Sequence, residues 1–261
     1  MIRLRTLLGA ALILAQAGIA QAAEPLKIGV STGPYTEILE FAAKLHKEKT
    51  GTDIKVVEFS DYTQPNAALA QGDIDFNNFQ HKPYLDNQIK TRGYDLVAVE
   101  RSIIVPLGLY SRKVTAQADL KDGASVAIPN DPANGARALL LLQQAGLIKL
   151  DPKVGIGATP LDIVDNPKKL KIREIDAAQL PRSLDDVDIA AVPLNYAVAA
   201  ELNPKTALFL EGVDTPWGLW FVTQTKRKDD PAIQAFIATY RSPEVKSFIA
   251  KRFDGTIIPT W

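Results

Sequence analysis

The strongest constraint on the fold is an alternation of short apolar runs with amphipathic runs, which occurs in two series along the chain. The first series consists of expected strands and helices at Leu26–Val30, Tyr35–Lys47, Ile54–Phe59, Pro65–Ala70, Ile74–Phe76, Pro83–Lys90 and Leu96–Val99. The second consists of Ser125–Ile128, Asn134–Ala145, Leu170–Ile175, Ala177–Leu184 and Ile189–Val192. Short apolar runs favour buried strands, and apolar residues at helical spacing favour helices. Strands that alternate with helices are typical of mainly parallel sheets.

Two extended segments join these series, so the pattern predicts two α/β lobes. Ile103–Tyr110 leads away from the first series, and Leu208–Leu210 follows the second. A strand at Trp217–Thr223 and helices at Pro231–Tyr240 and Pro243–Arg252 are expected to return to the first lobe. We predict lobe 1 at residues 23–108 and 209–261 and lobe 2 at residues 109–208. Such a layout places a cleft at the strand ends of both lobes and allows hinge closure around a ligand.

The first 22 residues have the pattern of a signal peptide. Arg3 and Arg5 precede a mostly apolar run, Leu7–Ile19, and Ala20-Gln21-Ala22 is a small-x-small cleavage signal. The apolar run is shorter than the stretch of about 20 residues that spans a bilayer. The sequence contains no cysteine, which leaves no disulfide and no cysteine-linked lipid. We therefore expect an exported, soluble periplasmic chain that is stabilised by its hydrophobic core.

Charge and histidine positions exclude several classes of partner. The chain has 30 basic and 30 acidic residues and no basic stripe, so no nucleic acid and no anionic membrane surface is expected as a partner. The two histidines, His46 and His81, do not have a metal-ligand spacing. We predict no metal, no cofactor and a monomeric chain.

The segment Ser125–Leu142, SVAIPNDPANGARALLLL, is expected to pass from a buried strand through a turn into a helix. Asn134 is a good N-cap residue, which places Arg137 in the first turn. A cation there opposes the helix dipole unless an anion lies against both. Free backbone amides and the guanidinium can bind such an anion. The segment therefore indicates a carboxylate or phosphate site at a strand end; the alternative is that Arg137 pairs with a nearby Asp on the surface.

Two aromatic and polar groups follow predicted strands at one edge of the first lobe. They are Phe59-Ser60-Asp61-Tyr62 and Phe79-Gln80-His81-Lys82-Pro83-Tyr84. Tyr, Phe and His side chains together suit a small amphipathic ligand. We predict that Tyr62, His81 and Tyr84 line a pocket and that Phe59 belongs to the core.

Gly29-Val30-Ser31-Thr32-Gly33 matches the G-x-S-x-G pattern between a strand and a helix, the context of a nucleophile elbow. The alternative function is therefore a secreted serine hydrolase that uses Ser31. However, this strand is the first of the mature chain, and no histidine occurs late in the sequence to act as the base. The favoured interpretation is a Gly/Ser loop that faces the cleft, in a protein that is not an enzyme.

Several long motifs resemble the methionine-binding lipoprotein family, or NLPA lipoprotein family, of ABC-importer periplasmic solute-binding proteins. They are Phe59-Ser60-Asp61-Tyr62 with Gln64-Pro65-Asn66, Asn77 with Phe79–Leu85, Pro129–Pro132 with Asn134-Gly135 and Arg137–Leu142, Asp162-Ile163-Val164 with Asn166-Pro167-Lys168, and Ala178–Asp186. The resemblance extends over essentially the whole mature chain. It implies a type II-like two-lobed periplasmic binding protein that closes on a free amino acid and delivers it to a permease driven by an ATPase. A membrane sensor in place of the permease is the alternative partner.

The resemblance also implies a set of ligand-binding residues. Arg137 would pair with the ligand carboxylate and Asn134 would assist, while Tyr62, Phe79, His81 and Tyr84 would enclose the ligand side chain. Asn195 and Trp217, which lie in two further family-like runs, complete the predicted site.

Three positions depart from the family pattern. Asn78 replaces an aromatic residue, and Pro193 and Leu219 each replace an Asn. A lost charge-assisted partner costs about 1.5–3 kcal/mol, or roughly ten- to a hundredfold in affinity. We therefore expect a carboxylate-bearing ligand that is methionine-like by family, with a dipeptide or an organic acid as alternatives.

Overall fold

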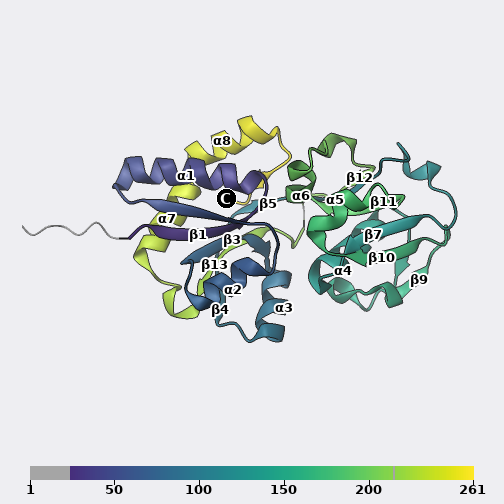
Figure 1. The fold of residues 1–261 in the computed structure, drawn as a ribbon, viewed down its shortest axis with the longest axis horizontal. Coiled ribbons are helices and arrows are strands. Elements are labelled where there is room, and N and C mark those ends of the chain that lie inside the picture. Colours follow the sequence, from purple (N-terminus) through teal and green to yellow (C-terminus); the bar gives the residue numbers. More distant parts are fainter. Residues whose placement is uncertain (1–23, 214) are drawn as a thin grey trace, which may run out of the picture.

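The computed structural model describes residues 24–213 and 215–261, which form two α/β lobes side by side (Figure 1). The predicted signal peptide at residues 1–22 lies outside the described residues. Within the described part of the chain, no helix has both the length and the apolar composition needed to cross a bilayer.

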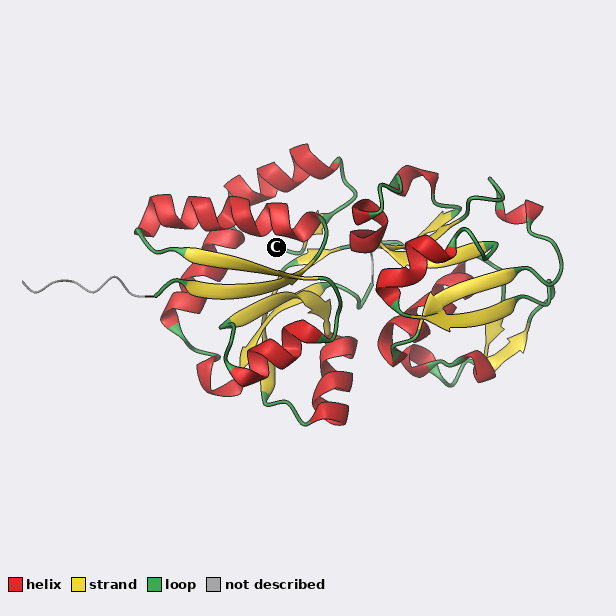
Figure 2. Cartoon of the chain, viewed as in Figure 1, coloured by secondary structure: helices red, strands yellow, loops and turns green. Residues whose placement is uncertain are grey.

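The first sheet contains residues from both ends of the described chain. Its strands, in spatial order, are β2 (Ile54–Phe59), β1 (Leu26–Ser31), β3 (Phe76–His81), β13 (Leu219–Gln224) and β4 (Leu96–Arg101). Its helices are α1 (Pro34–Thr50), α2 (Gln64–Gln71), α3 (Lys82–Arg92), α7 (Pro231–Tyr240) and α8 (Pro243–Phe253). Strand β13 lies between β3 and β4, so the chain returns to this sheet after it has built the second one (Figure 1). Helices flank the strands in both lobes (Figure 2).

The second sheet repeats this arrangement. Its strands, in spatial order, are β10 (Lys171–Ile175), β7 (Ser125–Pro129), β11 (Ile189–Pro193), β6 (Leu107–Tyr110) and β12 (Phe209–Leu210). Its helices are α4 (Pro132–Gln144), α5 (Leu180–Ser183) and α6 (Leu194–Ala199). Two small antiparallel pairs complete the fold, namely β5 (Ile103–Ile104) with β14 (Ile258–Pro259) and β8 (Lys149–Leu150) with β9 (Ile163–Asp165).

Both large sheets are mixed but mainly parallel. Strand β13 runs antiparallel to both of its neighbours, and the other four strands of its sheet share one direction. In the second sheet, β6 is the corresponding antiparallel strand. The predicted fold class is confirmed, and the parallel strands bring their carboxyl ends to one edge of each sheet.

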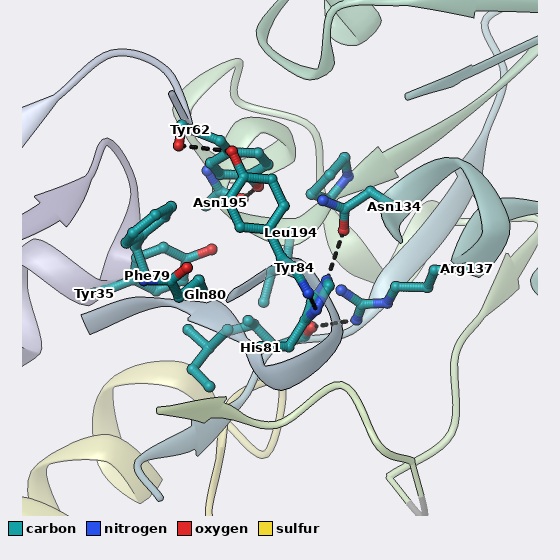
Figure 3. Close-up of a pocket in the computed structure, with 13 residues that line it drawn as sticks. Tyr35, Tyr62, Phe79, Gln80, His81, Tyr84, Asn134, Arg137, Leu194 and Asn195 are labelled. Carbon is teal, nitrogen blue, oxygen red and sulfur yellow. Dashed lines mark hydrogen bonds between the residues drawn. The ribbon is translucent and has the colours of Figure 1, made fainter. Parts of the chain in front are cut away.

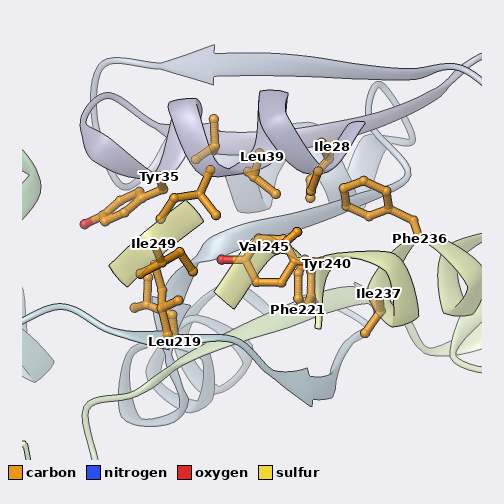
Figure 4. Close-up of a cluster of buried hydrophobic side chains, with 14 of the residues drawn as sticks. Ile28, Tyr35, Leu39, Leu219, Phe221, Phe236, Ile237, Tyr240, Val245 and Ile249 are labelled. Atoms are coloured by element: carbon orange, nitrogen blue, oxygen red, sulfur yellow. The ribbon is translucent and has the colours of Figure 1, made fainter. Parts of the chain in front are cut away.

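Separate hydrophobic cores lie on the two faces of each sheet. In the first lobe, α1, α7 and α8 pack on one face around aromatic residues such as Phe221, whose ring centroid lies 4.9 Å from that of Tyr240 (Figure 4). Helices α2 and α3 cover the other face through Leu69 and Leu85. In the second lobe, α4 packs on one face, and α5 and α6 cover the other.

Several local elements differ from the sequence-based expectation. Helix α4 begins at Pro132, and its N-cap is Asp131, whose side chain accepts a hydrogen bond from the amide of Asn134. Asn134 is therefore not the N-cap, and Arg137 lies in the second turn. Strand β3 extends to His81, so the segment 77–81 is strand and not loop. The expected helix Ala177–Leu184 is a 3₁₀ turn followed by the short helix α5.

The chain passes between the lobes twice, from β5 to β6 and from β12 to β13. Strand β6 starts at Leu107 and strand β12 ends at Leu210, and both belong to the second sheet. The predicted division after residue 108 therefore falls inside β6, and the division after residue 208 separates β12 from the strand with which it pairs.

Candidate functional site

A small cavity lies between the carboxyl-terminal ends of the strands of the two lobes (Figure 3). Most of its lining comes from β3 and α3 of the first lobe and from α4 and the junction of β11 with α6 of the second, and α1, β13 and two connecting segments add one residue each. The lining residues are Tyr35, Tyr62, Phe79, Gln80, His81, Tyr84, Val105, Asn134, Arg137, Pro193, Leu194, Asn195 and Leu219. The two lobes thus enclose the site together.

Arg137 projects from α4 toward this cavity but is already paired within the protein. Its Nε donates to Glu211 Oε1 at 3.0 Å, and its Nη2 donates to Glu211 Oε2 and, at 2.9 Å, to the carbonyl of Val105. Both side chains are buried, at 4% and 5% exposure. This bidentate pair places a carboxylate of the protein itself against the guanidinium. It is buried and uses a glutamate, so the alternative of a surface pair with Asp is wrong.

Asn134 and His81 connect the lobes across the cavity. His81 Nε2 and Asn134 Oδ1 lie 3.0 Å apart, and the backbone amide of Tyr84 donates to His81 Nδ1. With Nδ1 accepting, Nε2 carries the proton and donates to the Asn134 oxygen. Burial, followed by the nearby positive charge of Arg137, lowers the pKa of His81 to about 3. His81 is therefore a neutral hydrogen-bonding group.

Aromatic rings form one wall of the cavity. The ring of Tyr62 lies 6.1 Å, between centroids, from each of Phe79 and Tyr84. The hydroxyl of Tyr62 donates to Asn195 Oδ1 at 2.6 Å, which ties the first lobe to the start of α6. Burial raises the pKa of both Tyr62 and Tyr84 well above the usual value, so both phenols stay protonated. The wall combines apolar ring faces with hydroxyl groups, which suits a small amphipathic ligand.

The predicted site residues occupy two positions relative to the cavity. Seven of the eight are in its lining, and Trp217 is not. Trp217 lies behind them, with its ring centroid 5.0 Å from that of His81 and 5.6 Å from the guanidinium carbon of Arg137. Trp217 thus supports two lining residues from outside the cavity.

The positions that depart from the family pattern also divide into two groups. Pro193 and Leu219 line the cavity and give it apolar surface. Asn78 does not line it; its Oδ1 accepts from the Ser102 hydroxyl inside the first lobe. Two of the three departures are therefore placed where they can affect ligand selection.

Sequence reasoning missed several residues of the site. Glu211 was not expected at all, because a single glutamate in a loop has no local signature. Gln80 lies beyond the expected strand Ile74–Phe76, but the structure places it in β3, where it is held by hydrogen bonds with Asn66 and Asn77. A run of buried amides in one strand could have indicated this network, because buried polar groups must find partners. Tyr35, Val105 and Leu194 were missed as well.

The serine of the G-x-S-x-G match has no catalytic neighbours among the described residues. Ser31 is fully buried, and its Oγ has no hydrogen-bond partner there. His46 instead pairs with Thr239 at 2.8 Å, and His81 is held by Asn134 and Tyr84. A nucleophile needs a base within hydrogen-bonding reach, and neither histidine provides one. In the same described residues, no group of three or more His, Cys, Asp or Glu side chains is placed to bind a metal ion.

Comparison with known proteins identifies the family. Residues 26–261 match the protein family described as NlpA lipoprotein. The D-methionine-binding lipoprotein MetQ of Salmonella typhimurium is 48% identical over 239 residues, which cover 90% of this chain and 88% of the relative. A nutrient-binding protein from Burkholderia cenocepacia, whose structure was solved bound to methionine, is 50% identical with a TM-score of 0.87, over 90% of this chain and all of that one.

A second solved structure, that of the methionine-binding protein MetQ, is 46% identical with a TM-score of 0.88, and covers 90% of this chain and 98% of that one. The matches extend over both lobes and both crossings between them. This chain is a member of the NlpA lipoprotein family.

Proposed function

We propose that this protein is the periplasmic substrate-binding component of an ABC importer and that it binds an amino acid of the methionine type between its two lobes. The observation that supports this most directly is the inter-lobe cavity with one guanidinium and an aromatic wall. The relative from Burkholderia cenocepacia, which is 50% identical, was solved with methionine bound.

The residues at the cavity have distinct roles in this proposal. Arg137 and Asn134, which both line the cavity, bind the ligand carboxylate. Arg137 does so through Nη1, because Nε and Nη2 are occupied, and Asn134 through the second hydrogen of Nδ2, because the first is donated to Asp131. Tyr62, Phe79 and Tyr84 enclose the apolar part of the ligand. Neutral His81 orients Asn134, Asn195 fastens the closed lobes through Tyr62, and Trp217 supports the guanidinium from outside.

We also propose that the two lobes move as units about the two crossings. The crossings lie before Leu107 and after Leu210, where each connecting strand of the second sheet begins or ends. Tyr196 Oη donates to the carbonyl of Ser60 at 3.3 Å across the lobes, and a contact of this kind would break if the lobes moved apart. Ligand binding would then stabilise the closed form by its contacts with both lobes.

The partners in this proposal are a permease and its ATPase, with the protein acting as a periplasmic monomer. A reconstituted permease–ATPase complex should hydrolyse ATP faster when the ligand-loaded protein is added than when the ligand-free protein is added. Docking on a membrane sensor in place of a permease would leave ATP hydrolysis unchanged.

Calorimetric titration of refolded, ligand-free protein tests the ligand assignment. The panel contains amino acids, dipeptides and organic acids, and methionine is expected to bind most tightly. A double variant, Arg137→Met with Glu211→Leu, removes the guanidinium without leaving a buried unpaired carboxylate. It should fold and bind methionine roughly ten- to a hundredfold more weakly, because it lacks the charged hydrogen bond to the ligand. Tight binding of a dipeptide or an organic acid and not of methionine would refute the ligand assignment.

A further inference from the structure

Glu211 is held so that it cannot itself bind a ligand. Its Oε1 accepts from Arg137 Nε, and its Oε2 accepts from Arg137 Nη2 and, at 3.2 Å, from the backbone amide of Leu107. Glu211 is buried and is not among the residues that line the cavity. Its carboxylate therefore lies behind the guanidinium, on the side away from the ligand space.

Arg137 keeps one amino group for a ligand. Nε and Nη2 are both occupied, whereas Nη1 makes no hydrogen bond to any residue that the structure describes. In Figure 3 the guanidinium end of Arg137 points toward His81 and the middle of the site. A ligand carboxylate can thus meet Nη1 while Glu211 continues to hold the other side of the same group.

The one formal charge in the cavity lining is balanced by a direct ion-pair partner. Among the described residues that line it, Arg137 is the one with a formal charge. His81 is neutral, and the lining tyrosines are protonated phenols. The carboxylate of Glu211, in direct contact with the guanidinium, offsets its charge, so the lining and its ion-pair partner together carry no net charge. The carboxylate of Asp131, which accepts from Asn134 Nδ2 at 3.0 Å, lies outside the lining. In a buried site of low dielectric constant, an unbalanced charge on the ligand is costly.

We propose that Glu211 is a specificity-determining residue: by neutralising Arg137 from behind, it makes the cavity select a ligand with no net charge, such as a zwitterionic amino acid, over an anion or a cation of the same shape. This inference rests on the proposed function. It assigns ligand discrimination to a residue that does not touch the ligand.

The test compares three ligands of nearly the same shape and different charge. At about pH 6 they are L-methionine with no net charge, its des-amino analogue with one negative charge, and its methyl ester, whose ammonium is then protonated, with one positive charge. Calorimetric titration of the ligand-free protein at one pH and ionic strength gives an affinity for each. The wild-type protein should bind methionine more tightly than either analogue, by about tenfold or more, because of the charge imbalance that each analogue brings.

Three variants separate the charge of Glu211 from its structural role. Glu211→Gln removes the negative charge and keeps the shape, so the affinity of the anionic analogue relative to methionine should rise about tenfold and that of the cationic ester should fall. Glu211→Asp retains the charge and should retain the wild-type order. Glu244→Gln, which removes a carboxylate paired with Lys49 on the surface of α8, is the matched control and should change neither ratio.

A charge effect changes the relative affinities of the two analogues in opposite directions. Loosened packing would instead weaken the binding of all three ligands alike. The inference is overturned if folded Glu211→Gln leaves both ratios unchanged. It is also overturned, without any variant, if the wild-type protein binds methionine and binds the anionic analogue equally well. A wild-type protein that binds none of the three ligands refutes the proposed function itself.

Discussion

Gly33 provides the sharpest test of lobe closure, because its Cα packs directly against a residue of the other lobe. It has φ +137° at the start of α1, and a Cβ built on it would lie 2.7 Å from Asn195 Cβ and 2.9 Å from Asn195 Cα. Asn195 belongs to the other lobe, and its side-chain amide donates to the carbonyl of Thr32 at 3.1 Å. Gly33→Ala should therefore hinder closure.

The size of the expected affinity loss follows from the steric overlap between the added Cβ and Asn195. A contact of 2.7 Å is well inside ordinary van der Waals distance, and the neighbouring atoms are backbone and Cβ, which cannot rotate away. Overpacking of this kind costs about 1–3 kcal/mol, and only the closed form bears the cost. Because the ligand binds to the closed form, its affinity should fall by about 5- to 150-fold.

Gly51→Ala is the matched control at the other end of the same helix. Gly51 also has a positive φ, +75°, but a Cβ there would meet nothing within 4 Å. Both variants should lose some stability from backbone strain, which is about 1–3 kcal/mol for such conformations. Only Gly33→Ala should also lose affinity in calorimetry and show a larger ligand-bound radius of gyration by X-ray scattering. If Gly33→Ala binds methionine within twofold of wild type, the closure argument is wrong.

Three further predictions concern hydrogen bonding and titration at or near the site. Tyr62→Phe removes the hydroxyl that donates to Asn195 across the lobes, so titration should show affinity weaker by about 0.5–1.5 kcal/mol, or roughly 2- to 10-fold. Folding lowers the pKa of His81 from 6.5 to about 3, so between these two pH values the unfolded chain binds a proton that the folded chain does not bind. The free energy of unfolding, measured with urea, should therefore be highest above pH 6.5 and fall by about 1.4 kcal/mol for each pH unit below it. The His81→Gln variant should show a flatter dependence on pH. An unchanged dependence in this variant would contradict the lowered pKa of His81. Ser31→Ala removes a buried hydroxyl that has no partner among the described residues, so thermal unfolding should show equal or slightly higher stability. Ester turnover by wild type that disappears in this variant would revive the hydrolase alternative.

The sequence was sufficient to predict those strands and helices whose formation depends mainly on residues close together in the chain. Apolar runs such as Ser125–Ile128 are buried strands in the structure, and the periodic apolar face of α1 packs on the first sheet as expected. The site residues could be named because aromatic and cationic side chains at strand ends, together with the resemblance, indicated a cleft. The family, the fold class and the composition of the cavity lining were thus largely available from the sequence.

Prediction from the sequence failed at a helix start where two nearby residues could each act as the N-cap. It also failed at a polar segment that is buried in the structure. Both Asp131 and Asn134 can cap a helix, and the structure uses Asp131, so the dipole argument for Arg137 started from the wrong turn. The segment 77–81 contains amides and a histidine, which suggested a loop. It is nevertheless a central strand, because the buried amides of Asn77 and Gln80 find a side-chain partner in Asn66.

The sequence by itself determined the strands, the helices and the kinds of side chain that the cleft contains, because these depend on neighbours along the chain. Only the tertiary structure shows which carboxylate neutralises the guanidinium and how closely the two lobes approach at Gly33. Arg137 and Glu211 are 74 residues apart, and Gly33 meets Asn195 only across the gap between lobes. Such pairings depend on how two separately folded sheets are placed, and no local pattern encodes that placement.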